Sequence, residues 1–128
     1  MVKATMNVEQ LTSQVSASNQ ISVKDVSTIA DMGVELLVCN RPDNEDEGQI
    51  SYDAIAKEAT KQGMQAISLP FSSYQITEAN RDELITLIET RKRIHLYCRS
   101  GSRCKRLWRE ANSVVGGEKE YNKMHSST

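Results

Sequence analysis

The chain has 128 residues, of which 38% are hydrophobic and 26% charged, and its formal net charge is −1. This length suits one domain with a modest core, and the balanced charge gives no reason to expect nucleic acid as a partner. Because no apolar run approaches the roughly 18 residues of a membrane span and the first residues lack a signal-peptide core, we expect a cytoplasmic protein without a membrane partner, or a periplasmic one if a signal peptide is removed.

Three segments are predicted along the chain: an N-terminal arm at 1–14, a catalytic domain at 15–115 and a flexible tail at 116–128. The arm carries little periodicity, so a short helix and an ordered extended arm both stay open. The tail begins at Gly116 and is polar, which is typical of a frayed end. Within the domain, residues 15–19 alternate weakly, which favours an edge strand.

Helix and strand patterns alternate through the rest of the chain. The expected N-cap residues of three helices are Ser22, Ser51 and Thr77, because small polar side chains accept hydrogen bonds from the first N–H groups of a helix. The expected strands are 34–39, 64–69 and 94–97. Such alternation implies parallel crossovers and an α/β fold with helices on both faces of the sheet. In these sheets ligands bind where the strands end, so the loops after Cys39, Leu69 and Tyr97 are expected to meet.

The stretch Tyr-Cys-Arg-Ser-Gly-Ser-Arg-Cys at 97–104 connects the last expected strand with a helix that contains Leu107. In that position the N–H groups of the loop and of the first helical turn form a cradle for an anion and favour thiolate over thiol. With Arg99 and Arg103 nearby, we expect the pKa of Cys98 to fall from about 8.5 toward or below neutrality. Cys98 is therefore the candidate nucleophile, and a strand-end cysteine in an ordinary turn is the structural alternative.

Three motifs, in this order and spacing, resemble one family: Asn-Arg-Pro-Asp at 40–43, Leu-Pro at 69–70 and the cysteine loop at 97–103. From about Val15 to Ala111, the chain is similar to the phosphatase-like domain of beta-lactamase-hydrolase-like proteins (DUF442), which are also classed as candidate sulfurtransferases. The resemblance implies a cysteine-phosphatase-like, three-layer α/β fold. Its central sheet would have four to five mostly parallel strands, with the cysteine strand near the centre.

Loop length separates the two chemistries that the resemblance implies. Cysteine phosphatases resemble one another in having five residues between cysteine and arginine, whereas four residues separate Cys98 from Arg103. Four is the spacing of rhodanese-like sulfurtransferases, whose shorter loop holds a cysteine persulfide. In addition, Tyr97 stands where phosphatases carry histidine, and the loop 70–74 contains no aspartate to act as their general acid.

From these features we predict a sulfurtransferase in which the Cys98 thiolate attacks the outer sulfur of thiosulfate or a small persulfide. An acceptor thiol (on a small molecule or a protein), cyanide or sulfite then takes the sulfur, and no cofactor is expected. A protein-tyrosine or dual-specificity type phosphatase that uses Cys98 and Arg103 on phosphotyrosine or a small phosphoester is the alternative, with Asp43 or Glu45 as a substitute acid. A catalytically idle anion-binding or interaction module is the third reading.

The candidate site residues are grouped by expected role. Cys98 and Arg103 are catalytic, and Arg103 would hold an anionic substrate in a two-point contact. The expected substrate-binding residues are Arg41, Asp43, Arg99, Ser100, Gly101, Ser102 and Cys104. Cys104 is either a resolving thiol or a small buried side chain, and Arg41 is expected to bond Asp43. The acidic cluster at 43–47 matches no calcium loop, so we expect solvated carboxylates rather than a metal site.

Overall fold

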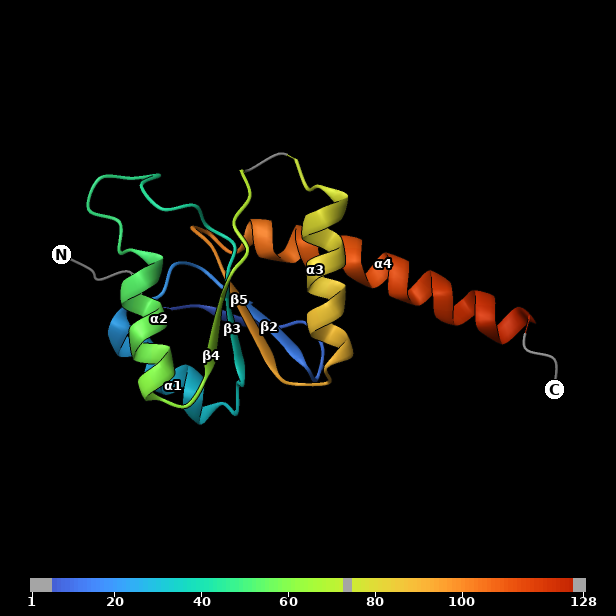
Figure 1. Ribbon diagram of the computed structural model, residues 1–128, viewed down its shortest axis with the longest axis horizontal. Coiled ribbons are helices and arrows are strands. Elements are labelled where there is room, and N and C mark those ends of the chain that lie inside the picture. The colour runs from blue at the N-terminus through green and yellow to red at the C-terminus, as the bar shows by residue number, and fades with distance from the viewer. Residues whose placement is uncertain (1–5, 73–74, 126–128) are drawn as a thin grey trace.

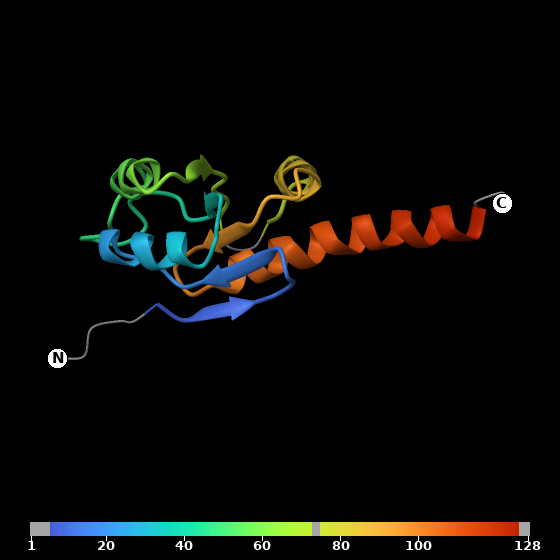
Figure 2. The same ribbon diagram turned by 90° about the horizontal axis from the view of Figure 1, so that it is seen from below.

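The computed structural model describes residues 6–72 and 75–125, and within them a five-stranded sheet lies between two layers of helices (Figures 1 and 2). The strands are β1 (Val8–Gln10), β2 (Val15–Ser18), β3 (Leu36–Cys39), β4 (Gln65–Ser68) and β5 (Ile94–Tyr97). They lie in the order β1-β2-β5-β3-β4, and only β1 runs antiparallel to its neighbour. The predicted fold class is confirmed, with β5, the strand directly before Cys98, at the centre.

The helices are α1 (Val23–Asp31), α2 (Tyr52–Lys61), α3 (Glu78–Glu89) and α4 (Ser102–His125). Three of them begin after the predicted cap residues. The Ser51 hydroxyl accepts the Ala54 N–H at 3.2 Å, the Thr77 hydroxyl accepts the Asn80 N–H at 3.1 Å, and Ser22 precedes α1 in a capping box. In the described part of the chain, no helix is both long and apolar enough to cross a bilayer.

The two faces of the sheet are covered by different helix pairs. Figure 1 shows α1 and α2 on one face, and α3 with the start of α4 on the other. Alternate residues of β5 point to opposite faces, so Leu96 packs with Leu84 and Leu107, whereas Tyr97 packs with Ile29 and other residues of the α1 and α2 layer. Each fully buried leucine of this kind stabilises the fold by about 1.5–3 kcal/mol, which fixes β5 firmly in the centre.

The ends of the chain differ from what the sequence indicates. Residues 8–10 of the expected arm form β1, and because all three side chains are exposed, no apolar alternation marks this strand. The edge-strand prediction for 15–19 is wrong, since β2 is buried between β1 and β5. Helix α4 continues past 115 to His125, beyond the start of the expected tail. The domain limits and the flexibility of 116–128 stay predictions.

The loops that follow the parallel strands meet at one edge of the sheet. The Asn40 N–H after β3 donates to the Tyr97 carbonyl at the end of β5, at 2.8 Å. The Phe71 N–H, after β4, donates to the Asn40 carbonyl at 3.4 Å, and the Gln20 N–H, after β2, donates to the Arg99 carbonyl at 3.2 Å. The three loops predicted to converge do so, and the loop after β2 joins them.

Candidate active site

Cys98 follows β5 directly and lies in the turn before α4. The residue is fully buried, with 0% of its surface exposed. The Gly101 N–H donates to the Cys98 sulfur at 3.0 Å, and hydrogen bonding from the N–H groups of Arg103 and Cys104 also lowers the pKa of Cys98. The predicted loop between strand and helix is thus closed around the sulfur, as a cradle of main-chain donors.

These donors favour the thiolate. The pKa of Cys98 is lowered from 9.0 to about 5, first by a hydrogen bond from the Cys104 thiol and then by the main-chain N–H groups, which together outweigh the opposing effect of burial. Burial and the neighbouring Cys98 raise the pKa of Cys104 well above its usual value, so Cys104 stays a thiol and a donor. The direction agrees with the sequence-based expectation, but the main cause is hydrogen bonding rather than arginine charge.

Gly101 allows the loop to lie against the end of β2. Its φ is +94°, a left-handed conformation that side chains rarely adopt, and a Cβ atom there would lie 3.3 Å from the Ser18 carbonyl carbon. The Cys98 N–H also donates to the Ser18 carbonyl oxygen, at 3.4 Å. A side chain at position 101 would push the loop away from β2 and move the N–H that holds the sulfur.

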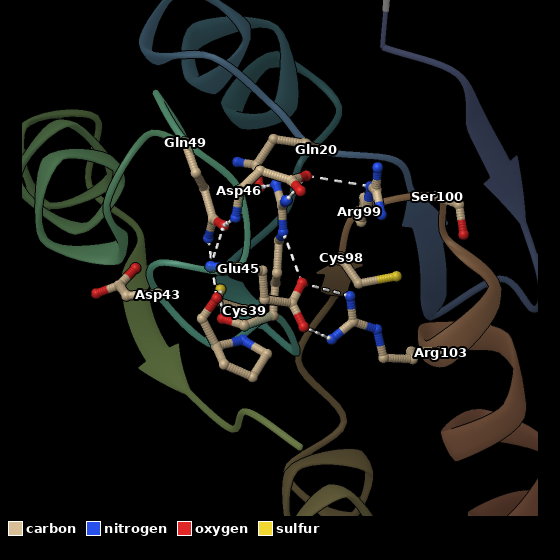
Figure 3. Close-up of polar contacts among 12 residues, drawn as sticks. Gln20, Cys39, Asp43, Glu45, Asp46, Gln49, Cys98, Arg99, Ser100 and Arg103 are labelled. Atoms are coloured by element: carbon tan, nitrogen blue, oxygen red, sulfur yellow. Dashed lines mark hydrogen bonds and ion pairs between the residues drawn. The ribbon is translucent and has the colours of Figure 1, made fainter. Parts of the chain in front are cut away.

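Arg103 and Glu45 form a two-point ion pair beside Cys98, in which Figure 3 shows the Glu45 carboxylate facing the guanidinium. The Arg103 Nη1 and Nη2 atoms donate to the two Glu45 oxygens at 2.8 and 2.7 Å, and Nη1 also donates to the Phe71 carbonyl at 3.3 Å. Hydrogen bonding from Arg103 lowers the pKa of Glu45. Within the described residues, the Arg103 Nε–H and the second Nη2 proton meet no acceptor, so one edge of the guanidinium stays available.

A second arginine fixes the same acidic loop. Arg41, only 5% exposed, donates from Nε to Glu45 at 2.9 Å, from Nη2 to Asp46 at 2.7 Å and from Nη1 to Gln20 at 2.9 Å. Asp46 also pairs with Arg99 at 3.2 Å. Glu45 and Asp46 are exposed to solvent, as expected, but both are also ion-paired and join the loop after β3 to the cysteine loop.

The remaining predicted residues have other partners. Asp43 accepts the Tyr52 N–H at 2.8 Å at the start of α2, where unpaired N–H groups attract a carboxylate. The predicted bond between Arg41 and Asp43 is therefore wrong. The Ser100 and Ser102 hydroxyls lie 2.9 Å apart and are exposed, so they bond each other at the rim of the loop.

Sequence reasoning missed the partners of the two buried arginines. It named Glu45 only as a substitute acid, and it gave no role to Asp46, Gln20 or the Phe71 carbonyl. The available signal is a charge count: arginines and carboxylates occur in loops that parallel strands bring to one edge, so they must pair or stay solvated. Within the described residues, no group of three or more histidine, cysteine or acidic side chains is arranged to hold a metal ion.

The geometry can now be compared with known proteins. The family described as "Beta-lactamase hydrolase-like protein, phosphatase-like domain" has a model that matches residues 7–114. The chain belongs to this family. That membership confirms the resemblance inferred from the cysteine loop, and it identifies the chain as a beta-lactamase hydrolase-like phosphatase-like domain. No curated protein matches the chain in sequence.

Solved structures place this phosphatase-like domain among cysteine-phosphatase folds. A candidate phosphatase from Neisseria meningitidis Z2491 is 29% identical, with a TM-score of 0.71 over 77% of this chain and 71% of the other. A candidate phosphatase (DUF442) from Shewanella putrefaciens CN-32 is 15% identical, with a TM-score of 0.74 over 86% and 69%. P. aeruginosa TpbA in complex with phosphotyrosine is 11% identical, with a TM-score of 0.56 over 74% and 54%. The last two similarities concern the fold alone.

Proposed function

We propose that the domain is a phosphoester hydrolase with Cys98 as its nucleophile. The observation that carries this proposal is the Cys98 sulfur, which accepts the Gly101 N–H at 3.0 Å beside the Arg103 guanidinium. Hydrogen bonding in this loop lowers the pKa of Cys98 to about 5, which favours a nucleophilic thiolate. Membership of a phosphatase-like family supports the same chemistry. So does the fold shared with TpbA, a protein solved with phosphotyrosine.

The reaction would proceed in two displacements. The Cys98 thiolate attacks phosphorus, the bond from phosphorus to the ester oxygen breaks, and the alcohol or phenol leaves while a phosphocysteine forms. Water then attacks phosphorus, the sulfur–phosphorus bond breaks, and inorganic phosphate leaves with Cys98 again a thiolate. The loop N–H groups would hold phosphoryl oxygens in both steps.

Arg103 would receive the phosphoryl group on the edge that Glu45 leaves open. Glu45 occupies the edge formed by Nη1 and Nη2, so the Nε–H and the second Nη2 proton can donate to two oxygens of one anion. Because Glu45 fixes the guanidinium plane, this edge is oriented before the substrate arrives. Glu45 is thus proposed as a positioning residue rather than the acid that sequence analysis considered.

The leaving group limits the choice of substrate. No carboxylate lies in the segment 70–76, and Glu45 is ionised because Arg103 and Arg41 lower its pKa. An alkoxide would need a proton that neither supplies, at a cost of about 10²- to 10⁴-fold in rate. A phenolate is far less basic, since the pKa of tyrosine is about 10. Aryl phosphates such as phosphotyrosine would therefore react faster than alkyl phosphates.

A second candidate function, persulfide transfer, is supported by the dimensions of the loop. Only four residues separate Cys98 from Arg103, and the loop is closed around a single sulfur atom that has no exposed surface. In this reaction Cys98 attacks the outer sulfur of thiosulfate, the sulfur–sulfur bond breaks, and sulfite leaves with the electron pair. An acceptor thiolate then attacks the outer sulfur of the Cys98 persulfide and restores the Cys98 thiolate.

Two parallel assays separate the candidates. Purified protein and a Cys98→Ser variant are incubated with p-nitrophenyl phosphate, and separately with thiosulfate and cyanide. We expect the wild-type protein to release nitrophenol and the Cys98→Ser variant not to. Thiocyanate formation by the wild type that is absent in the variant, without nitrophenol release, would instead favour persulfide transfer. Inactivity in both assays, with phosphate still bound, would overturn both proposals and leave an anion-binding module.

A further inference from the structure

Three polar side chains are buried together on the face of the sheet that α1 and α2 cover. His95 of β5 exposes 0% of its surface, and Ser16 and Ser18 of the neighbouring strand β2 expose 2% each. Next to them on this face, Leu37 and Tyr97 belong to an apolar cluster. Polar groups lose free energy on burial unless they are hydrogen-bonded, so a polar trio in this layer needs a physical reason.

Hydrogen bonds connect the three side chains into a chain that ends at the main chain of β2. The Ser16 hydroxyl lies 2.7 Å from His95 Nδ1, and the Ser18 hydroxyl lies 2.8 Å from Nε2. The Ser18 hydroxyl donates its own proton to the Asn19 carbonyl at 2.9 Å, so it accepts the proton on Nε2. His95 thereby holds the Ser18 side chain, which in turn holds the carbonyl of the next residue.

The cysteine loop lies against the peptide group that links Ser18 to Asn19. The Ser18 carbonyl oxygen accepts the Cys98 N–H at 3.4 Å. A Cβ atom at position 101 would lie 3.3 Å from the Ser18 carbonyl carbon and 3.6 Å from the Asn19 nitrogen, so the loop approaches this peptide closely. Because the Gly101 N–H donates to the Cys98 sulfur at 3.0 Å, a change in the direction of the peptide would move a donor that holds the nucleophile.

We propose that His95 is a positioning residue, which through the Ser18 hydroxyl fixes the peptide between Ser18 and Asn19 against the cysteine loop. The inference rests on the proposed function, since it concerns the same nucleophile. His95 has no exposed surface and does not touch a substrate, so its effect reaches Cys98 only through β2. Ser16 bonds the other ring nitrogen from a position two residues further from the loop, and it orients the imidazole.

Ser16→Ala and Ser18→Ala are a matched pair that tests this role. Each removes one buried hydroxyl and one partner of the His95 ring, so both should lower the stability to urea by a similar amount. Only Ser18 contacts the cysteine loop. The pKa of Cys98 is measured by ultraviolet absorbance of the thiolate, with Cys98→Ser added to each variant as the blank. We expect that pKa to rise by about one unit or more in Ser18→Ala and to keep its wild-type value in Ser16→Ala. Equal pKa values of Cys98 in the two serine variants would overturn the proposal.

Two substitutions of His95 separate hydrogen bonding from packing. His95→Leu removes the donor to Ser18 and should raise the pKa of Cys98 as Ser18→Ala does. Glutamine keeps an N–H donor near the place of Nε2, so His95→Gln should keep that pKa close to the wild-type value. A rise in His95→Gln as large as in His95→Leu would overturn the proposal, and Ser18→Ala serves as the comparison if His95→Leu does not fold.

These measurements are independent of the reaction that the domain catalyses, because no substrate takes part in them. Absence of nitrophenol release from the wild type would refute the proposed phosphoester hydrolysis and leave the pKa values of Cys98 in the variants unaffected. Conversely, equal pKa values in Ser16→Ala and Ser18→Ala would refute the positioning role of His95 in a protein that still releases nitrophenol.

Discussion

Glu45 and Arg103 are 58 residues apart in sequence, yet their side chains form a two-point ion pair with N–O distances of 2.8 and 2.7 Å. Glu45 comes from the loop after β3, and Arg103 from the first turn of α4. The Arg103 side chain is 8% exposed and the Glu45 side chain 26%, so solvent screens the pair only in part. The pair joins the acidic loop to the cysteine loop and sets the direction of the guanidinium.

Glu45→Gln should reduce activity without altering the nucleophile. The amide offers one oxygen instead of two, so Arg103 loses its fixed plane, and we expect kcat/KM for p-nitrophenyl phosphate to fall by about 10- to 100-fold. Glu47→Gln is the matched control, because Glu47 is an exposed carboxylate in the same loop. If Glu45 only positions Arg103, the pKa of Cys98 should be the same in Glu45→Gln as in the wild type. Equal losses of kcat/KM in Glu45→Gln and Glu47→Gln would contradict the positioning role.

Gly101→Ala should disable the cradle. The new Cβ would meet the Ser18 carbonyl at 3.3 Å in a backbone conformation of φ +94°, so the loop must shift away from the sulfur. We expect the pKa of Cys98 to rise and activity to be lost. Gly63→Ala supplies the control, since Gly63 has a φ of +83° but no atom within 4 Å of the added Cβ. It should cost about 1–2 kcal/mol of stability and leave the titration of Cys98 unchanged.

Arg41→Met should destabilise the fold. Arg41 is buried and its guanidinium binds Glu45, Asp46 and Gln20, so its removal leaves part of this polar network unpaired. Because both carboxylates are partly exposed, we expect a loss of about 1–3 kcal/mol in the urea-derived free energy of unfolding. Arg81→Met removes an exposed ion pair with Asp82 and should change that free energy by less than about 1 kcal/mol. Similar losses of unfolding free energy in Arg41→Met and Arg81→Met would contradict a stabilising role for the buried Arg41 network.

A buried histidine should make stability depend on pH. His95 is fully buried between two serines, with Ser16 at 2.7 Å from Nδ1 and Ser18 at 2.8 Å from Nε2. Because the Ser18 hydroxyl donates to the Asn19 carbonyl, it accepts from Nε2–H, which leaves Nδ1 to accept from Ser16. The ring is therefore neutral, and burial lowers the pKa of His95 from 6.5 to about 4.

The direction of this pH dependence follows from the pKa of His95 in the unfolded and the folded chain. The unfolded chain binds a proton on His95 below pH 6.5, whereas the folded chain resists until about pH 4, so stability is complete above 6.5 and falls between these values. The loss amounts to about 3 kcal/mol by pH 4. Unfolding by urea across this range, compared with His95→Gln, measures the difference. Parallel pH curves for the two proteins would show that folding does not lower the pKa of His95.

The sequence predicted the central fold because the relevant patterns are local. Caps at Ser51 and Thr77 and the apolar strand at 94–97 reflect burial and hydrogen bonds within a few residues, which the sequence displays directly. Strand β1 escaped prediction, since it is held by main-chain pairing with β2 and buries none of its side chains. Pairing of this kind leaves no mark on the side-chain pattern.

The position of Cys98 between β5 and α4 was predictable from the sequence, but the charge pairing around it was not. Cys98 follows from the strand, loop and helix signals that flank it. The choice of Asp43 as partner of Arg41 followed sequence proximity, whereas Asp43 is drawn to the start of α2 and leaves Glu45 and Asp46 to the arginine. Which carboxylate meets which guanidinium depends on loop geometry across distant strands, and single-sequence reasoning has no access to that.

The most direct test of the account is the titration of Cys98. Ultraviolet absorbance of the thiolate is measured against pH for the wild type and for Cys98→Ser, and the difference isolates this sulfur without requiring a reagent to reach it. The account predicts a single transition with a pKa of about 5. A transition at or above about 8.5, the value of an ordinary cysteine, would contradict the claim that the loop holds Cys98 as a nucleophilic anion.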